Sequence, residues 1–233
     1  MNYKLGEVTM SVRRLIVSIA CVLVAAACSD RPSPLAPLPQ SGGPHFLRLP
    51  STTLRFEAIG AVAKGPGVHD GSFSLADPNG VSVNTYEASF WAKRGESRTL
   101  QINYVSGTST SPFLRFTATD PTYVPGRGTL AVGDSVLITV RVDSQTVAAH
   151  FEPSGLQFGA PSALTLWYGG IEGDLNGDGV VDGTDATIES QLLGMWYRDS
   201  STNTWSPLFS ARSSTEKWVA ADVPHFSEYA ISW

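Results

Sequence analysis

From Phe46 onward, short runs of alternating apolar and polar residues dominate the chain. In the clearest run, β-branched residues occupy every second position: Val136, Ile138, Val140 and Val142. A period of two predicts a strand with one buried face. Similar runs predict strands over residues 53–58, 86–92, 99–105, 113–118, 147–152, 164–168, 217–223 and 226–232. Turn-forming clusters such as Pro125-Gly126-Arg127-Gly128 separate them, so the pattern predicts an all-β fold, a β-sandwich.

Only residues 184–193 have a helical pattern. They contain no Gly or Pro, and they place Ile188 and Leu192 four positions apart, on one face of a helix. No repeat of fixed period and no heptad pattern is present, which argues against a solenoid or a coiled coil.

The first 27 residues have the pattern of a signal peptide. Arg13 and Arg14 precede an apolar run over residues 15–27, which ends in three alanines before Cys28 and is too short to span a bilayer. The sequence Val24-Ala25-Ala26-Ala27-Cys28 resembles a bacterial lipobox, which implies cleavage before Cys28 and acylation of its thiol. The family analogy also implies that Ser29 favours the outer membrane. Plain secretory cleavage after the alanines is the alternative; both predict export to the cell envelope or beyond.

Residues 28–45 contain five prolines and little apolar surface, which predicts a tether between the membrane and the folded part. Residues 1–27 hold three basic residues and one acidic residue, so 13 basic and 20 acidic residues follow, a net charge of −7. This charge argues against nucleic acid as a partner. Cys21 lies in the leader and Cys28 is the predicted lipidation site, so no disulfide is expected.

Residues 174–185 match a twelve-residue calcium loop position by position. Oxygen donors fall at loop positions 1, 3, 5, 7, 9 and 12: the side chains of Asp174, Asn176 and Asp178, the carbonyl of Val180, and the side chains of Asp182 and Asp185. Gly179 is expected to take a positive φ at the sharp turn, and Val181 to pack inward. The sequence therefore predicts bound Ca²⁺. A solvated acidic turn is the simplest alternative, and Mg²⁺ suits the donors less well.

The loop resembles one protein family, and the segments on either side of it resemble another. The run Gly173-Asp174-Leu175-Asn176-Gly177-Asp178-Gly179, continuing to Leu192-Leu193, resembles one half of a dockerin repeat. The run Phe151-Glu152-Pro153-Ser154-Gly155-Leu156-Gln157-Phe158 and the closing His225-Phe226-Ser227-Glu228-Tyr229-Ala230 resemble the ZU-five domain, a β-sandwich.

These resemblances imply an N-terminal β region over residues 46–134 and a ZU-five-like sandwich over residues 135–233. They also imply that the calcium loop and its short helix are an insertion at a hairpin joining strands near 164–168 and 195–198. Binding to a cohesin is not implied, because dockerins that bind cohesins normally carry two such repeats.

No set of residues predicts catalysis. Asp222, His225 and Ser227 lie too close along one extended segment to form a nucleophile, base and acid triad. His150 with Glu152, and the isolated His45 and His69, lack a third zinc ligand at plausible spacing. We therefore expect a non-catalytic, calcium-binding envelope lipoprotein with a structural, adhesive or interaction role and an unidentified protein or polysaccharide partner.

The alternative is a carbohydrate-binding accessory module. It depends on six tryptophans: Trp91, Trp167, Trp196, Trp205, Trp218 and Trp233. Core packing is their expected role, because most of them lie in strand-like segments; exposure of two or more on one face would favour sugar binding instead.

Overall fold

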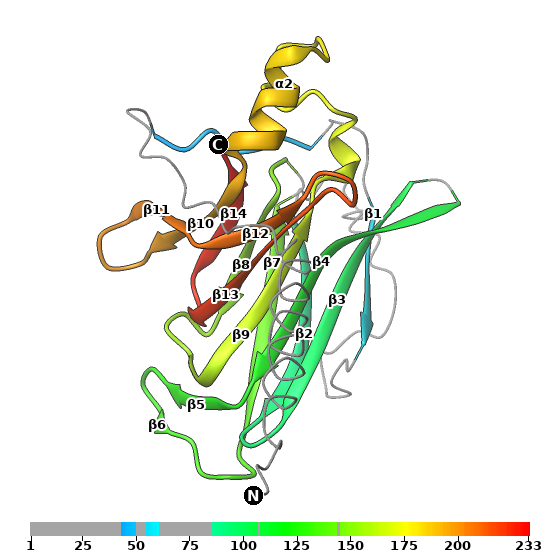
Figure 1. Cartoon of the computed structure of the whole chain (residues 1–233). Coiled ribbons are helices and arrows are strands. Elements are labelled where there is room, and N and C mark those ends of the chain that lie inside the picture. The colour runs from blue at the N-terminus through cyan, green and yellow to red at the C-terminus, as the bar shows by residue number, and fades with distance from the viewer. Residues whose placement is uncertain (1–42, 50–54, 61–84, 107, 144) are drawn as a thin grey trace, which may run out of the picture. The chain divides into compact units, whose positions relative to one another are not determined.

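The computed structural model describes residues 43–49, 55–60, 85–106, 108–143 and 145–233 (Figure 1). The predicted signal peptide 1–27, the lipidation site Cys28 and residues 28–42 of the predicted tether lie outside these ranges. No helix in the described part of the chain has the length and apolar character needed to cross a bilayer.

Two antiparallel sheets form the domain, which confirms the predicted all-β sandwich. The larger sheet contains eight strands: β1 (Arg55–Gly60), β3 (Ser97–Ser106), β4 (Ser109–Thr119), β5 (Pro121–Val124), β6 (Gly128–Thr129), β9 (Gln157–Trp167), β12 (Ser210–Ser213) and β13 (Trp218–His225). The smaller sheet contains six: β2 (Thr85–Lys93), β7 (Ser135–Asp143), β8 (Ala148–Glu152), β10 (Gly194–Asp199), β11 (Thr204–Leu208) and β14 (Glu228–Ser232).

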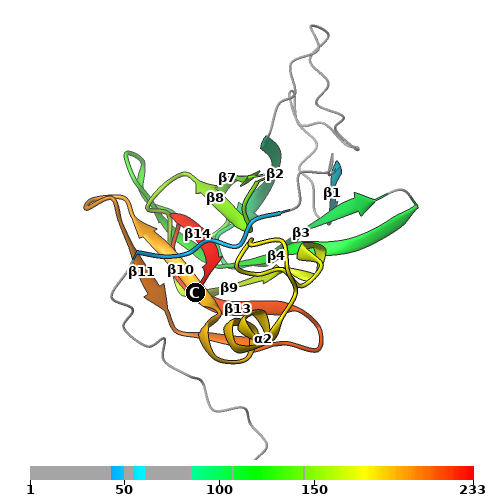
Figure 2. The ribbon, with the colours of Figure 1, turned by 90° about the horizontal axis from the view of Figure 1, so that it is seen from above.

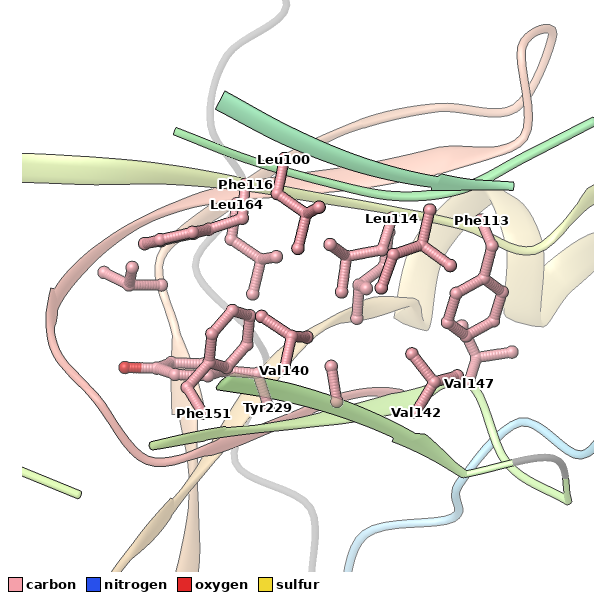
Figure 3. Packing of buried hydrophobic residues seen from close by; sticks show 14 of the residues in the cluster. Leu100, Phe113, Leu114, Phe116, Val140, Val142, Val147, Phe151, Leu164 and Tyr229 are labelled. Atoms are coloured by element: carbon pink, nitrogen blue, oxygen red, sulfur yellow. The ribbon is translucent and has the colours of Figure 1, made fainter. Parts of the chain in front are cut away.

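The core lies between the sheets, where buried hydrophobic side chains of both sheets meet (Figure 3). The alternation predicted for β7 is confirmed, because Val136, Ile138, Val140 and Val142 are all buried. Across from them Phe116 of β4 is fully buried, with ring centroids 5.0 Å from Phe151 and 5.3 Å from Phe226. Such aromatic contacts between sheets fix how the layers pack.

Strands from both sides of residue 134 are combined in each sheet. β2 pairs with β7 along nine residue pairs in the smaller sheet, and β4 pairs with β9 in the larger one. The buried residues of both ranges also belong to one hydrophobic cluster. The ranges 46–134 and 135–233 therefore share a single sandwich.

Residues 43–49, which we call the N-terminal strap, lie between the C-terminal strand and the segment before β8. His45 exchanges two backbone hydrogen bonds with Trp233, and Leu47 donates to Ile231 and accepts from Val147. Leu47 is fully buried. The predicted tether extends to residue 45, and the backbone of His45 already pairs with the sandwich.

The segment between β9 and β10 crosses from one sheet to the other. β9 pairs with β4 on one side and β13 on the other, so it has no free edge for β10. β10 instead pairs with β11 and β14 in the smaller sheet. The expected insertion at a hairpin is therefore wrong: the acidic loop lies in a connection between sheets, at the end of the sandwich where α2 and the C-terminus lie (Figure 2).

Candidate metal centre

The connection from β9 to β10 is made of short turns and two short helical segments. A 3₁₀ turn, η1 (Gly169–Ile171), follows β9, and the chain then reverses at Glu172 and Gly173, both with positive φ. After the acidic loop come the helix α2 (Gly183–Thr187) and a π-helical turn, η2 (Ile188–Leu192). The helix predicted over residues 184–193 is therefore present, with a wider second turn.

Within the loop, side-chain oxygens accept hydrogen bonds from amides further along the chain. The Asp174 carboxylate accepts from Gly177 N at 2.8 Å and from Gly179 N at 2.9 Å. Asn176 Oδ1 accepts from Asp178 N at 3.0 Å, and Asp178 Oδ1 accepts from Val180 N at 2.8 Å. The backbone thus wraps around its own acidic and amide oxygens.

Two glycines allow this wrapping. Gly179 has φ of 86°, as the sequence predicts for loop position 6, and Gly177 has φ of 75°. No atom would lie within 4 Å of a Cβ at either residue, so the glycines are needed for their backbone conformation, not for space.

Asp185 closes the loop from the first turn of α2. Its Oδ1 accepts from Leu175 N at 2.7 Å and Asn176 N at 3.2 Å, and its Oδ2 accepts from Asp182 N at 2.9 Å. The amide of Asp182, with those of Leu175 and Asn176, holds the pKa of Asp185 below its ordinary value although the side chain is buried. The carboxylate is thus ionised and joins both ends of the loop.

Asp182 is the N-cap of the same helix. Its Oδ1 accepts from Thr184 N at 2.7 Å, and with Asp185 it forms a capping box. Helix initiation therefore uses both carboxylates, and loop closure uses the carboxylate of Asp185 with the amide of Asp182.

The structure brings the six predicted ligand residues into one loop, but it does not converge their carboxylates on a point. Among the described residues, no three His, Cys, Asp or Glu side chains are close enough together to hold a metal ion. The carboxylates of Asp174, Asp178 and Asp185 are instead turned to backbone amides.

The donor set nevertheless fits a hard cation. Every donor is an oxygen, and in the described part of the chain none of these carboxylates forms an ion pair with Lys, Arg or His. Each carboxylate oxygen that accepts one amide hydrogen bond retains a lone pair for a ligand.

The expected inward packing of Val181 is wrong. Val181 is 65% exposed, while Leu175 at loop position 2 is only 6% exposed and packs into the core. The turn at Gly179 places Val181 on the outer side of the loop, against Gly173. Leu175, between Asp174 and Asn176, therefore connects the loop with the hydrophobic interior.

Side chains from distant strands hold the helical segments in place. Arg212 of β12 donates from Nη1 to the carbonyl of Leu193 at 2.9 Å and from Nη2 to that of Ser190. Burial lowers the pKa of the Arg212 guanidinium, which still satisfies carbonyls that a helix end leaves free. No local pattern of residues indicates this contact, because Arg212 is 19 residues from Leu193.

A second polar contact involves Glu189. Its Oε1 accepts from Lys217 Nζ at 2.5 Å and from the hydroxyl of Tyr168 at 3.1 Å. Burial, with the nearby Glu189 carboxylate, raises the pKa of Tyr168, so the phenol remains a proton donor. Both ends of the connection are therefore fixed to the sandwich.

The residues weighed for other chemistry have structural partners. Ser227 donates to the carbonyl of Arg198, and His225 Nδ1 lies 3.3 Å from the carbonyl of Phe226. His150 Nε2 lies 2.8 Å from Glu152 Oε1 on the same strand, β8, where both side chains are half-buried.

We expect Arg212→Met to loosen η2 by leaving the carbonyls of Ser190 and Leu193 without their donor. The loss should be about 1–3 kcal/mol in the free energy of unfolding, measured by denaturant titration. Arg48→Met, which removes an exposed guanidinium from the strap, is the matched control. Equal stability of the two variants would contradict the role given to Arg212.

Comparison with known proteins adds nothing to this geometry, since no protein-family model, curated protein or solved structure matches the chain. The dockerin-type and ZU-five resemblances therefore rest on the residues that carry them.

Proposed function

We propose that residues 174–185 bind a calcium ion that stabilises a non-catalytic β-sandwich with an adhesive, scaffold or interaction role at the cell envelope. The observation that carries this proposal is the wrapping of the chain around Asp174, Asn176 and Asp178, with positive φ at Gly177 and Gly179. Oxygen donors at alternate positions of such a loop match the spacing that calcium coordination uses, and their carboxylates would turn toward the ion when it binds.

In the proposed site, Asp174, Asn176 and Asp178 supply side-chain oxygens and Val180 its carbonyl. Asp182 and Asp185 complete the set from the start of α2. A bound cation would offset the mutual repulsion of the four carboxylates and stabilise the loop conformation.

A structural role for the ion is supported by the position of the loop. Leu175, Ile188 and Leu193, from the loop and from the helical segments, are buried in the hydrophobic cluster. Opening the loop would expose this surface, at about 25 cal/mol for each Å² of apolar area. The ion would therefore stabilise the domain itself.

Calcium should raise the melting temperature of the wild-type chain. At a free calcium concentration about 100 times Kd, the added stability is about 2.7 kcal/mol. The variant Asp174→Ala/Asp178→Ala should show neither the calorimetric heat of calcium binding nor the rise in melting temperature. Asp222→Ala, which removes an exposed carboxylate from β13, should behave like wild type.

If wild type and the double variant melt alike with and without calcium, the proposed site is wrong. Titration with magnesium separates a calcium site from a general divalent-cation site, since magnesium demands a tighter octahedron.

The proposed envelope location rests on the residues around Cys28. Acylation of Cys28 predicts that the chain partitions into membranes and that Cys28→Ser releases it. Mass spectrometry of the N-terminal peptide separates the two alternatives: a Cys28 carrying acyl chains supports the lipoprotein, and an unmodified thiol supports plain secretion.

A carbohydrate-binding module is a second candidate, favoured by one observation. Trp167 of β9 and Trp218 of β13 are directly opposite in register, and both are partly exposed. Their neighbours Leu166 and Val219 are fully buried, so the tryptophans lie on the outer face of the larger sheet. Arg115 lies over the Trp167 ring, 5.7 Å from its centroid.

If this outer face binds sugars, oligosaccharides should quench tryptophan fluorescence, and Trp167→Ala/Trp218→Ala should abolish the quenching. Trp91→Ala removes a tryptophan that is 40% exposed on the other sheet and is the control. Absence of retention on polysaccharide columns, or equal quenching in both variants, would exclude this candidate.

A further inference from the structure

The N-terminal strap is held by backbone hydrogen bonds on both sides. On the side that faces the C-terminal segment, His45 N donates to Trp233 O at 3.0 Å and Leu47 N donates to Ile231 O at 3.2 Å. On the other side, Leu49 N donates to Gln145 O at 2.8 Å. The strap thus lies between two segments, with isolated β-bridges at Phe46 and Arg48, and its first three residues are the end of the predicted tether.

The side chain of Trp233 joins this strap to the acidic loop. Its ring stacks on that of His45, with centroids 4.6 Å apart and planes at 16°. Its Nε1 donates to the carbonyl of Leu175 at 3.4 Å. One indole therefore contacts the strap through its face and the loop through its nitrogen.

The peptide group between Leu175 and Asn176 continues the connection. Its carbonyl accepts from Trp233, and its amide donates to Oδ1 of Asp185 at 3.2 Å. A peptide group is planar, so its carbonyl and amide cannot turn independently. The hydrogen bond from Trp233 and the hydrogen bond to Asp185 therefore share one rigid peptide group.

We propose that the acidic loop and the strap are energetically coupled through Trp233, so that calcium at the loop tightens the attachment of the strap to the sandwich. This inference rests on the proposed calcium site. Calcium then regulates how firmly the domain holds the segment that links it to the tether. By linkage, docking of the strap strengthens calcium binding by the same factor.

Amide hydrogen exchange of the full chain, with chelator or with saturating calcium, tests the coupling. Calcium should slow exchange of the hydrogen-bonded amides of His45, Leu47 and Leu49 by about fivefold or more, the usual lower range for coupled sites. Trp233→Phe keeps an aromatic ring against His45 but removes the Nε1 donor. In this variant calcium should still slow exchange of the loop amides, but it should no longer slow exchange of the strap amides. Calcium affinity should fall by the factor by which calcium slows strap exchange in wild type.

Trp205→Phe is the matched control, since the Trp205 ring contacts Phe46 of the strap at 4.7 Å from another strand, β11. In Trp205→Phe, calcium should slow exchange of the strap amides as it does in wild type. Suppose that calcium binding gives a calorimetric heat and slows exchange of the loop amides, but leaves the exchange rates of the strap amides unchanged. The proposed coupling would then be wrong, while the calcium site would remain supported. The coupling would also be wrong if calcium slowed exchange of the strap amides as much in Trp233→Phe as in wild type. If calcium gave no calorimetric heat of binding and did not slow exchange of the loop amides, both the calcium site and the coupling would be rejected.

Discussion

The connection from β9 to β10 is the constraint on which the candidate site depends, because it must carry the chain from one sheet to the other across the end of the sandwich. Both edges of β9 are occupied, so the chain has to leave the larger sheet. A crossing of this length is costly to order unless it packs on the domain. Leu175 within the acidic loop, and Ile188 and Leu193 after it, supply that packing.

Side-chain hydrogen bonds to the backbone also stabilise this connection, in addition to its buried apolar residues. Asp185 satisfies three amides at the start of the crossing, while Arg212 satisfies two carbonyls at its end. Buried backbone groups without partners would each cost about 1–3 kcal/mol, so a helix as short as α2 depends on these side chains. The carboxylates of the loop therefore have a structural task whether or not an ion is bound.

Features set by local sequence could be predicted, and features set by distant pairing could not. The strand β7 and the positive φ of Gly179 follow from neighbouring residues alone. The short strands β5, β6, β11 and β12 were missed, since two to five residues carry too little alternation. Sheet membership of β9 and β10 depends on partners such as Leu164 with Ala221, which are far apart in sequence. Arg212 and Trp233 reach the connection for the same reason.

The same geometry favours a stabilising ion over a calcium sensor. A sensor requires helices that separate when the ion binds and expose an apolar groove. Here Arg212 and Lys217 bind the helical segments to the larger sheet, and Ile188 is buried beneath them. Opening would break these contacts. An ion at this loop would lie close to the contact of Trp233 with the Leu175 carbonyl, and the same indole stacks on His45 of the strap.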